Sequence, residues 1–280
     1  MSLNIGFMQG RLSPLVDGKI QSFPWNTWEK EITHAKGLGL SIMEWTLDQD
    51  RLYENPLMTY SGQAKIAELC KKHDFAIPAL TGDCFMQAPF WKAIDNDLMD
   101  KLKKDFNSIL EACSTVGIKF VVVPLVDDGR LENMKQENIL VEFLLAQQEN
   151  LNQLDVKVVF ESDFHPAKLK RFISRFNFHS FGINYDTGNS AGLGLDPIDE
   201  FDAIGDRILN VHIKDRLLGG PTVPLGEGNA DLSIVFSLLE SQGYQANYIL
   251  QTARATDGDH GSVLLKYKSM VEGWVGCSGS

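Results

Sequence analysis

Acidic, amide and imidazole side chains recur where short apolar segments end in the second half of the chain. They are two carboxylates, one imidazole and one amide: Glu161, Asp186, His212 and Gln251. Carboxylates and imidazole together suit Mn²⁺, Mg²⁺, Co²⁺ or Zn²⁺, and the hard oxygen ligands favour the first two. Taken singly, each has an ordinary alternative role, as an ion-pair partner, a turn residue or a core histidine. The prediction of a site rests on the recurrence of such residues at the same position, the end of an apolar segment, in one segment after another.

A short apolar strand followed by an amphipathic helix repeats along the chain. The predicted strands are Asn4–Met8, Ser41–Trp45, Ala76–Thr81, Lys119–Pro124, Val156–Glu161, Ser180–Asp186, Ile208–Lys214 and Asn247–Gln251. The predicted helices are Thr27–Gly37, Tyr60–His73, Asn96–Val116, Asn133–Leu154, Pro166–Phe176, Asp199–Ile204, Leu232–Gln242 and Gly261–Val271. Eight such units in 280 residues suit a (β/α)₈ TIM barrel of ~250 residues with longer loops.

We therefore expect a single TIM-barrel domain over residues 1–280, because no linker or break in composition divides the chain. A doubly wound open sheet is the competing architecture, since periodicity alone does not separate the two. In a barrel, the carboxyl ends of the parallel strands meet at one mouth, where active sites form. The four polar side chains would then face one another there.

Charge and composition exclude several classes of protein. The 26 Lys and Arg against 37 Asp and Glu give a net charge of −11, which disfavours a nucleic-acid partner. No apolar run reaches the ~18–20 residues of a membrane-spanning helix, so no membrane partner is expected. The cysteines have no C-x-x-C spacing and are expected to be free thiols of a cytoplasmic protein: Cys70, Cys84, Cys113 and Cys277.

The chain resembles the xylose-isomerase-like sugar-phosphate isomerases and epimerases over nearly its whole length. The segments that carry the resemblance are Met8–Pro14, Ile42–Trp45, Glu161, Asp186–Asn189, Val211–Asp215 and Val223–Leu232. Within that family, the chain most resembles the ketose and L-ribulose-5-phosphate 3-epimerase-like members. The resemblance implies a divalent metal, with Mn²⁺ favoured, held by Glu161, Asp186 and His212 and a fourth residue on the eighth strand.

That fourth position departs from the family, which has a glutamate where this chain has Gln251. An amide oxygen remains an acceptable ligand, but an amide does not exchange a proton at neutral pH. Glu161 is then the expected catalytic base, and inversion at carbon needs a stand-in such as Glu44, Glu227 or a water on the metal.

The expected function is metal-dependent isomerisation or epimerisation of a small sugar or sugar phosphate through an enediolate. Alternatives are a non-catalytic sugar-binding or regulatory relative and a dehydratase of a cyclic ketose. An apurinic-site endonuclease of the same fold is disfavoured by the net charge and by only six histidines. Relatives of this kind are often oligomers, so a homo-oligomer is possible.

Residues expected at the substrate carry polar or charged side chains near the predicted mouth. The expected substrate-binding residues are Asn189, Lys214, Arg216, Glu227 and Arg254, with Arg11 a further anion binder. Four aromatic residues are candidates to line the pocket: Trp45, Phe85, Phe90 and Trp91.

Overall fold

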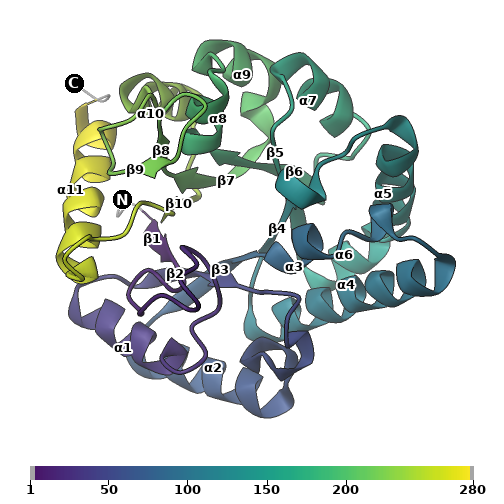
Figure 1. Cartoon of the computed structure of the whole chain (residues 1–280), viewed down its shortest axis with the longest axis horizontal. Coiled ribbons are helices and arrows are strands. Elements are labelled where there is room, and N and C mark those ends of the chain that lie inside the picture. The colour runs from purple at the N-terminus through teal and green to yellow at the C-terminus, as the bar shows by residue number, and fades with distance from the viewer. Residues whose placement is uncertain (1–3, 278–280) are drawn as a thin grey trace.

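Eight parallel strands close into a barrel at the centre of the molecule (Figure 1). The structure is a computed structural model and describes residues 4–277. The barrel strands are β1 (Ile5–Met8), β2 (Ile42–Thr46), β3 (Ala76–Thr81), β4 (Phe120–Leu125), β5 (Lys157–Ser162), β6 (Phe181–Asp186), β7 (Ile208–Ile213) and β10 (Asn247–Leu250). Because β1 pairs with both β2 and β10, the sheet has no free edge. The predicted TIM barrel is confirmed, and the open sheet is excluded.

Helices surround the barrel, as Figure 1 shows. They are α1 (Trp28–Gly37), α2 (Tyr60–His73), α3 (Asp83–Gln87), α4 (Asn96–Val116), α5 (Met134–Ala146), α6 (Gln148–Leu154), α7 (Pro166–Ile173), α8 (Thr187–Leu193), α9 (Pro197–Ile204), α10 (Leu232–Ser241) and α11 (His260–Cys277). The helix predicted over Asn133–Leu154 is divided at Gln147 into α5 and α6. The sequence analysis missed α3 and α8, two short helices that begin directly after β3 and β6.

The four aromatic residues proposed for the pocket belong to the apolar core between barrel and helices. Trp45 is fully buried and packs against Trp28 with ring centroids 5.7 Å apart. Phe85 and Phe90 both pack against Phe106 of α4. The expectation that they line the pocket is wrong, because their side chains are enclosed by the helical layer.

The segment Val223–Leu232, one of those that carry the family resemblance, folds around one buried carboxylate. Asp215 begins a short hairpin of β8 (Asp215–Arg216) and β9 (Thr222–Val223). Its two oxygens accept hydrogen bonds from the backbone N–H groups of Gly226, Gly228 and Ala230 at 2.9, 2.9 and 3.0 Å. A Cβ at Gly228 would lie 2.1 Å from Asp215 Oδ1, so glycine is required there. The residue types of this segment therefore follow from the structure of the loop around Asp215.

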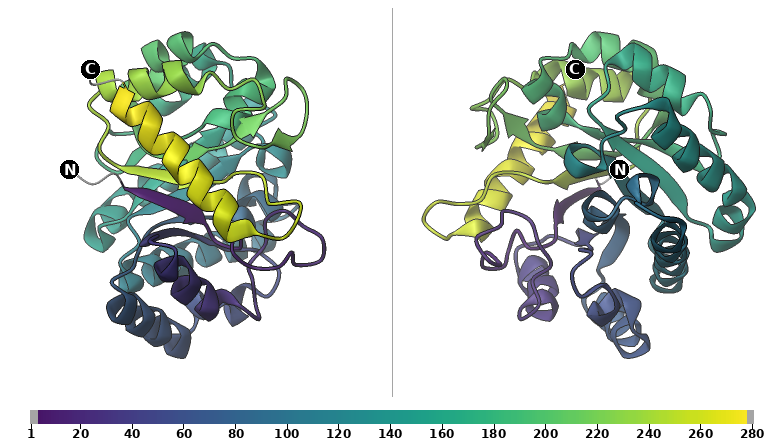
Figure 2. Two further views of the ribbon diagram at one scale, coloured as in Figure 1. Left: turned by 90° about the vertical axis from the view of Figure 1, so that its left-hand side faces the viewer. Right: turned by 45° about the vertical axis from the view of Figure 1, so that its right-hand side comes forward.

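The long loop after β1 is fastened to the far end of the chain by two arginines. Arg11 Nε donates to the Thr252 carbonyl at 3.0 Å. Arg254 donates to the carbonyls of Gly10, Ser13 and Ile20 at 2.6, 2.7 and 3.2 Å. Figure 2 shows this purple loop beside the yellow loop that precedes α11. The two arginines therefore hold residues 20 and 21 at the barrel mouth.

Two further expectations concern the environment of the chain. Within residues 4–277, none of the helices combines the length and apolar character needed to cross a membrane. Cys70, Cys84 and Cys113 are free thiols, as predicted, and the side chain of Cys277 lies outside the described residues.

Replacement of Arg254 tests its clamping role. We expect Arg254→Met to lower the free energy of unfolding by about 3 kcal/mol, because three charge-assisted hydrogen bonds to carbonyls are lost. Urea unfolding of the variant and of Lys104→Met, which removes an exposed charge on α4, provides the measurement and its control. Equal stability of the two variants would contradict the role.

Candidate metal centre and substrate cavity

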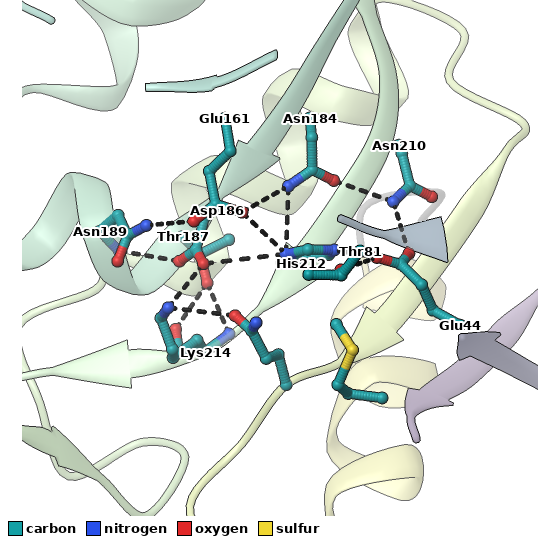
Figure 3. Close-up of polar contacts among 12 residues, drawn as sticks. Glu44, Thr81, Glu161, Asn184, Asp186, Thr187, Asn189, Asn210, His212 and Lys214 are labelled. Atoms are coloured by element: carbon teal, nitrogen blue, oxygen red, sulfur yellow. Dashed lines mark hydrogen bonds and ion pairs between the residues drawn. The ribbon is translucent and has the colours of Figure 1, made fainter. Parts of the chain in front are cut away.

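Three neighbouring strands bring two carboxylates and an imidazole together at the mouth of the barrel (Figure 3). Glu161 lies near the end of β5, Asp186 is the last residue of β6, and His212 lies in β7. Asp186 and His212 stand opposite each other in the β6–β7 register. One ligand atom from each of the three residues lies within 4.8 Å of the others, and all three side chains are buried. This group can hold a metal ion.

His212 is fastened by carboxylates on both sides of its ring. Nε2 lies 2.8 Å from Glu44 Oε1, and Nδ1 lies 3.2 Å from Glu161 Oε2. Burial lowers the pKa of His212, but the charges of Glu44 and Glu161 and their hydrogen bonds outweigh it and raise the pKa to about 10. The imidazolium donates to both carboxylates. In the neutral tautomer, Nε2–H stays on Glu44 and Nδ1 is directed at Glu161 and Asp186, as in a metal-ligating histidine.

A buried polar layer lies beneath this group and fixes its orientation. Glu44 accepts hydrogen bonds from Thr81 Oγ1 and from Asn210 Nδ2, the latter at 2.8 Å. Asn210 also donates to Asn184 Oδ1 at 2.8 Å, and Asn184 Nδ2 donates to Glu161 Oε2 at 3.1 Å. Sequence reasoning missed both asparagines. Each precedes a site residue by two positions in its strand, so the period of two places it on the same inward face.

Lys214 is the second cation of the site. Its Nζ lies 2.7 Å from Asp186 Oδ2 and donates to Gln251 Oε1 at 3.1 Å. Asp186 Oδ2 is buried and accepts no hydrogen bond of regular geometry from the part of the chain that the structure describes. The oxygen and nitrogen donors of Glu161, Asp186 and His212 fit a divalent cation. The ammonium of Lys214, however, stands between two of the four predicted ligands.

Glu161 is held as a carboxylate. Burial would raise its pKa, but the hydrogen bond and charge of His212, together with the charge of Lys214, keep the pKa below its ordinary value. Oε1 accepts a hydrogen bond from Asn189 Nδ2 at 2.6 Å. Such a carboxylate, facing a cavity beside two cations, is chemically suited to accept a proton.

A cavity of about 440 Å³ opens beside these residues. Its lining includes Glu161, Asn189, Lys214, Arg216 and Gln251 from the predicted set. It also includes residues that the sequence analysis did not select, among them Gln21, Asp83, Asp127, Arg130 and Asp163.

Several residues expected at the substrate lie elsewhere. Glu227 is exposed on the loop around Asp215 and does not line the cavity. Arg254 is the backbone clamp described above. Glu44, suggested as a second proton carrier, is fully buried behind His212.

Arg216, in contrast, lines the cavity as expected, and its Nη2 donates to the Gly220 carbonyl at 2.9 Å.

Asp83 is the missed residue with the most unusual environment. It begins α3 directly after β3 and is 8% exposed. Burial is the main cause that raises its pKa to about 7; the hydrogen bond from Gln21 opposes this rise, and the charges of Asp48 and Glu161 add smaller raising contributions. The position after a strand end is the same signal that identified Glu161, and it would have found Asp83.

The raised pKa of Asp83 predicts a pH-dependent cost to stability. The folded protein holds the proton of Asp83 more tightly than the unfolded chain does. The contribution of this protonation to the free energy of unfolding is therefore fully present below pH 3.8 and is lost as the pH rises through 7. Asn does not ionise, so the stability of Asp83→Asn relative to wild type should be greater at pH 8 than at pH 4.5. We expect the free energy of unfolding to differ by at most about 4 kcal/mol more at the higher pH. Urea unfolding at both pH values measures this. A difference that stays constant, as expected for the exposed control Asp128→Asn, would contradict it.

Comparisons with known proteins agree with this architecture. A curated relative, inosose isomerase of Bacillus subtilis (strain 168), is 24% identical over 212 residues, which cover 65% of this chain and 75% of the relative. The solved 3-keto-D-glucoside 4-epimerase YcjR of E. coli matches with a TM-score of 0.72 and 15% identity, covering 97% of this chain and all of that one. The solved IolI protein with a bound zinc atom has a TM-score of 0.74 and 18% identity, and 98% of each chain is covered.

The family relationship follows from the sequence as well as the shape. The model of the xylose isomerase-like TIM barrel family matches residues 32–265, which include all of the predicted metal ligands. The chain belongs to the xylose isomerase-like TIM barrel family.

Proposed function

We propose that this protein is an isomerase or epimerase of a small keto sugar or keto-cyclitol, with Glu161 as the base. The observation that carries the proposal is the Glu161 carboxylate, which lines the cavity beside the cations of His212 and Lys214. A proton next to a carbonyl is removed most easily when a carboxylate base and positive charge for the developing oxyanion stand together.

The names of the relatives support a carbonyl substrate. An inosose is an inositol with one hydroxyl oxidised to a ketone, and a 3-keto-glucoside likewise carries a ring ketone. Isomerisation and epimerisation next to such a carbonyl both begin with loss of a proton from the adjacent carbon. A single base of the Glu161 type is sufficient for that first step.

In the mechanism that we propose, Glu161 takes the proton from the carbon beside the carbonyl. Lys214 and Arg216 line the same cavity and place positive charge near the oxygen that becomes negative. Asn189 donates to Glu161 Oε1 and so orients the carboxylate. A divalent cation held by Glu161, Asp186 and His212, with Gln251 nearby, would supply Lewis-acid polarisation of the carbonyl when bound.

The charges of the cavity favour an uncharged substrate over a phosphorylated one. Lys214 lies against Asp186, and Arg130 lies 2.5 Å from Asp163. Both cations are therefore already paired with carboxylates, and Asp127 adds negative charge to the lining, while Arg216 donates to the Gly220 carbonyl and to Asn189 Oδ1. A phosphate would have to displace these carboxylates, whereas the hydroxyl groups of a sugar can bond to cations and carboxylates alike.

Exchange of hydrogen with solvent tests the function. We expect wild-type protein in D₂O with a divalent metal to introduce deuterium next to the carbonyl of at least one member of a panel of an inosose, ribulose, fructose and fructose 6-phosphate, monitored by NMR. Glu161→Gln should lower the rate at least about 100-fold. Glu142→Gln, on the exposed side of α5, is the matched control. Binding of a panel member without any exchange would favour a sugar-binding protein instead.

Metal binding tests the role of Lys214. The ammonium must leave Asp186 and Gln251 before a cation takes its place, so Lys214→Met should bind Mn²⁺ at least about tenfold more tightly in calorimetry. Lys119→Met removes an exposed lysine at the opposite end of the barrel and should bind as wild type. Unchanged affinity in Lys214→Met would show that the ammonium does not compete.

A further inference from the structure

Inversion at a carbon needs a second group that carries a proton, and Gln251 is not one. The cavity contains three further carboxylates besides Glu161. Asp163 is held by Arg130, with 2.5 Å between Oδ2 and Nε, and Asp127 is exposed at the rim. Asp83 is buried, faces the cavity and accepts a hydrogen bond from an amide.

We propose that Asp83 is the second catalytic residue of this cavity and exchanges a proton with the substrate carbon from another side than Glu161. This inference rests on the proposed function and names a group that completes it. The observation that supports it is a chain of two hydrogen bonds from side-chain amides, which runs along the cavity wall from Gln251 to Asp83.

The chain joins Asp83 to the position of the missing glutamate. Gln251 Nε2 donates to Gln21 Oε1 at 2.9 Å, and Gln21 Nε2 donates to Asp83 Oδ2 at 2.9 Å. Gln21 stands at the mouth because the two arginines hold its loop there. The carboxyl that position 251 lacks is thus present two hydrogen bonds away, in the same cavity.

Asp83 and Glu161 approach the cavity from different strands. In the barrel order β3 and β5 are separated by β4, so the two carboxyls stand on different parts of the wall. A substrate between them presents one side to each. Inversion requires two proton-carrying groups that reach the carbon from different directions, and β3 and β5 give the two carboxyls different starting points.

The environment of Asp83 makes it able to give and take a proton near neutral pH. The charged groups that face it are Asp48, Glu161, His212 and Arg11, and burial is the main cause of its pKa of about 7.

The proposed step is balanced in protons and electrons. Glu161 takes the proton from the carbon, and the C–H electron pair forms the double bond of the enediolate while the carbonyl π pair moves to oxygen. The oxygen pair then reforms the carbonyl, and the carbon takes the proton of Asp83 from the other side. Glu161 is left protonated and Asp83 ionised, and exchange with solvent through the open cavity restores both.

Asp83→Asn separates the two proton transfers. The test uses D₂O and the member of the ketone panel that wild-type protein exchanges fastest, with the deuterium content of recovered substrate and of inverted product measured by NMR. We expect Asp83→Asn to introduce deuterium into the substrate at a rate near that of wild type, while inversion falls at least about 100-fold. Glu161→Gln should lose both.

Controls make the outcomes distinguishable. Asp105→Asn removes another buried carboxylate, on α4 away from the cavity, and should retain both rates. If Asp83→Asn is poorly folded in circular dichroism, Asp83→Ser replaces it.

Inversion at the wild-type rate in a folded Asp83 variant would overturn the assignment, as would parallel loss of exchange and inversion. Wild-type protein that exchanges and isomerises without inverting would overturn the role of Asp83 and leave the proposed function standing. Absence of exchange in wild type would overturn both.

Discussion

The balance of buried charge at the barrel mouth is the constraint on which the site depends. Glu44, Glu161 and Asp186 are all withdrawn from water, and an ionised carboxylate in the interior costs several kcal/mol unless it is paired. His212 and Lys214 supply the positive charge, one between Glu44 and Glu161 and one on Asp186. Because three buried carboxylates share these two cations, removal of either cation leaves a buried negative charge without its partner.

The exchange of a family glutamate for Gln251 is understandable within this balance. A fourth buried carboxylate beside Asp186 would raise the negative charge that a cation must neutralise. With an amide there, Lys214 satisfies Asp186 and still donates to Gln251 Oε1. In the mechanism that we propose, an amide at this position also offers less negative charge to a divalent ion and does not carry a proton.

The barrel could be predicted from the sequence because strands alternate regularly with helices along the chain. Polar residues also recur at the ends of successive strands, and this pattern identified Glu161, Asp186 and His212. Gln21 could not be found in this way, since it lies in an irregular loop whose path is set by Arg11 and Arg254. Nor could the sequence separate Arg254, which binds carbonyls, from Arg216, which reaches the cavity, because a guanidinium fits both roles.

The barrel also explains how the second carboxyl can be on a different strand. Every strand end of a TIM barrel reaches the same mouth, so chemistry depends on which side chains face the cavity and little on their order in the chain. Asp83 follows β3 at the start of α3, and the Gln21 amide connects it to position 251. An acid supplied from there would differ from one on the eighth strand in direction, since Asp83 reaches the cavity from the end of β3 and is hydrogen-bonded to the Gln21 amide. A site of this kind keeps base and acid distinct even when no fourth charged ligand is present.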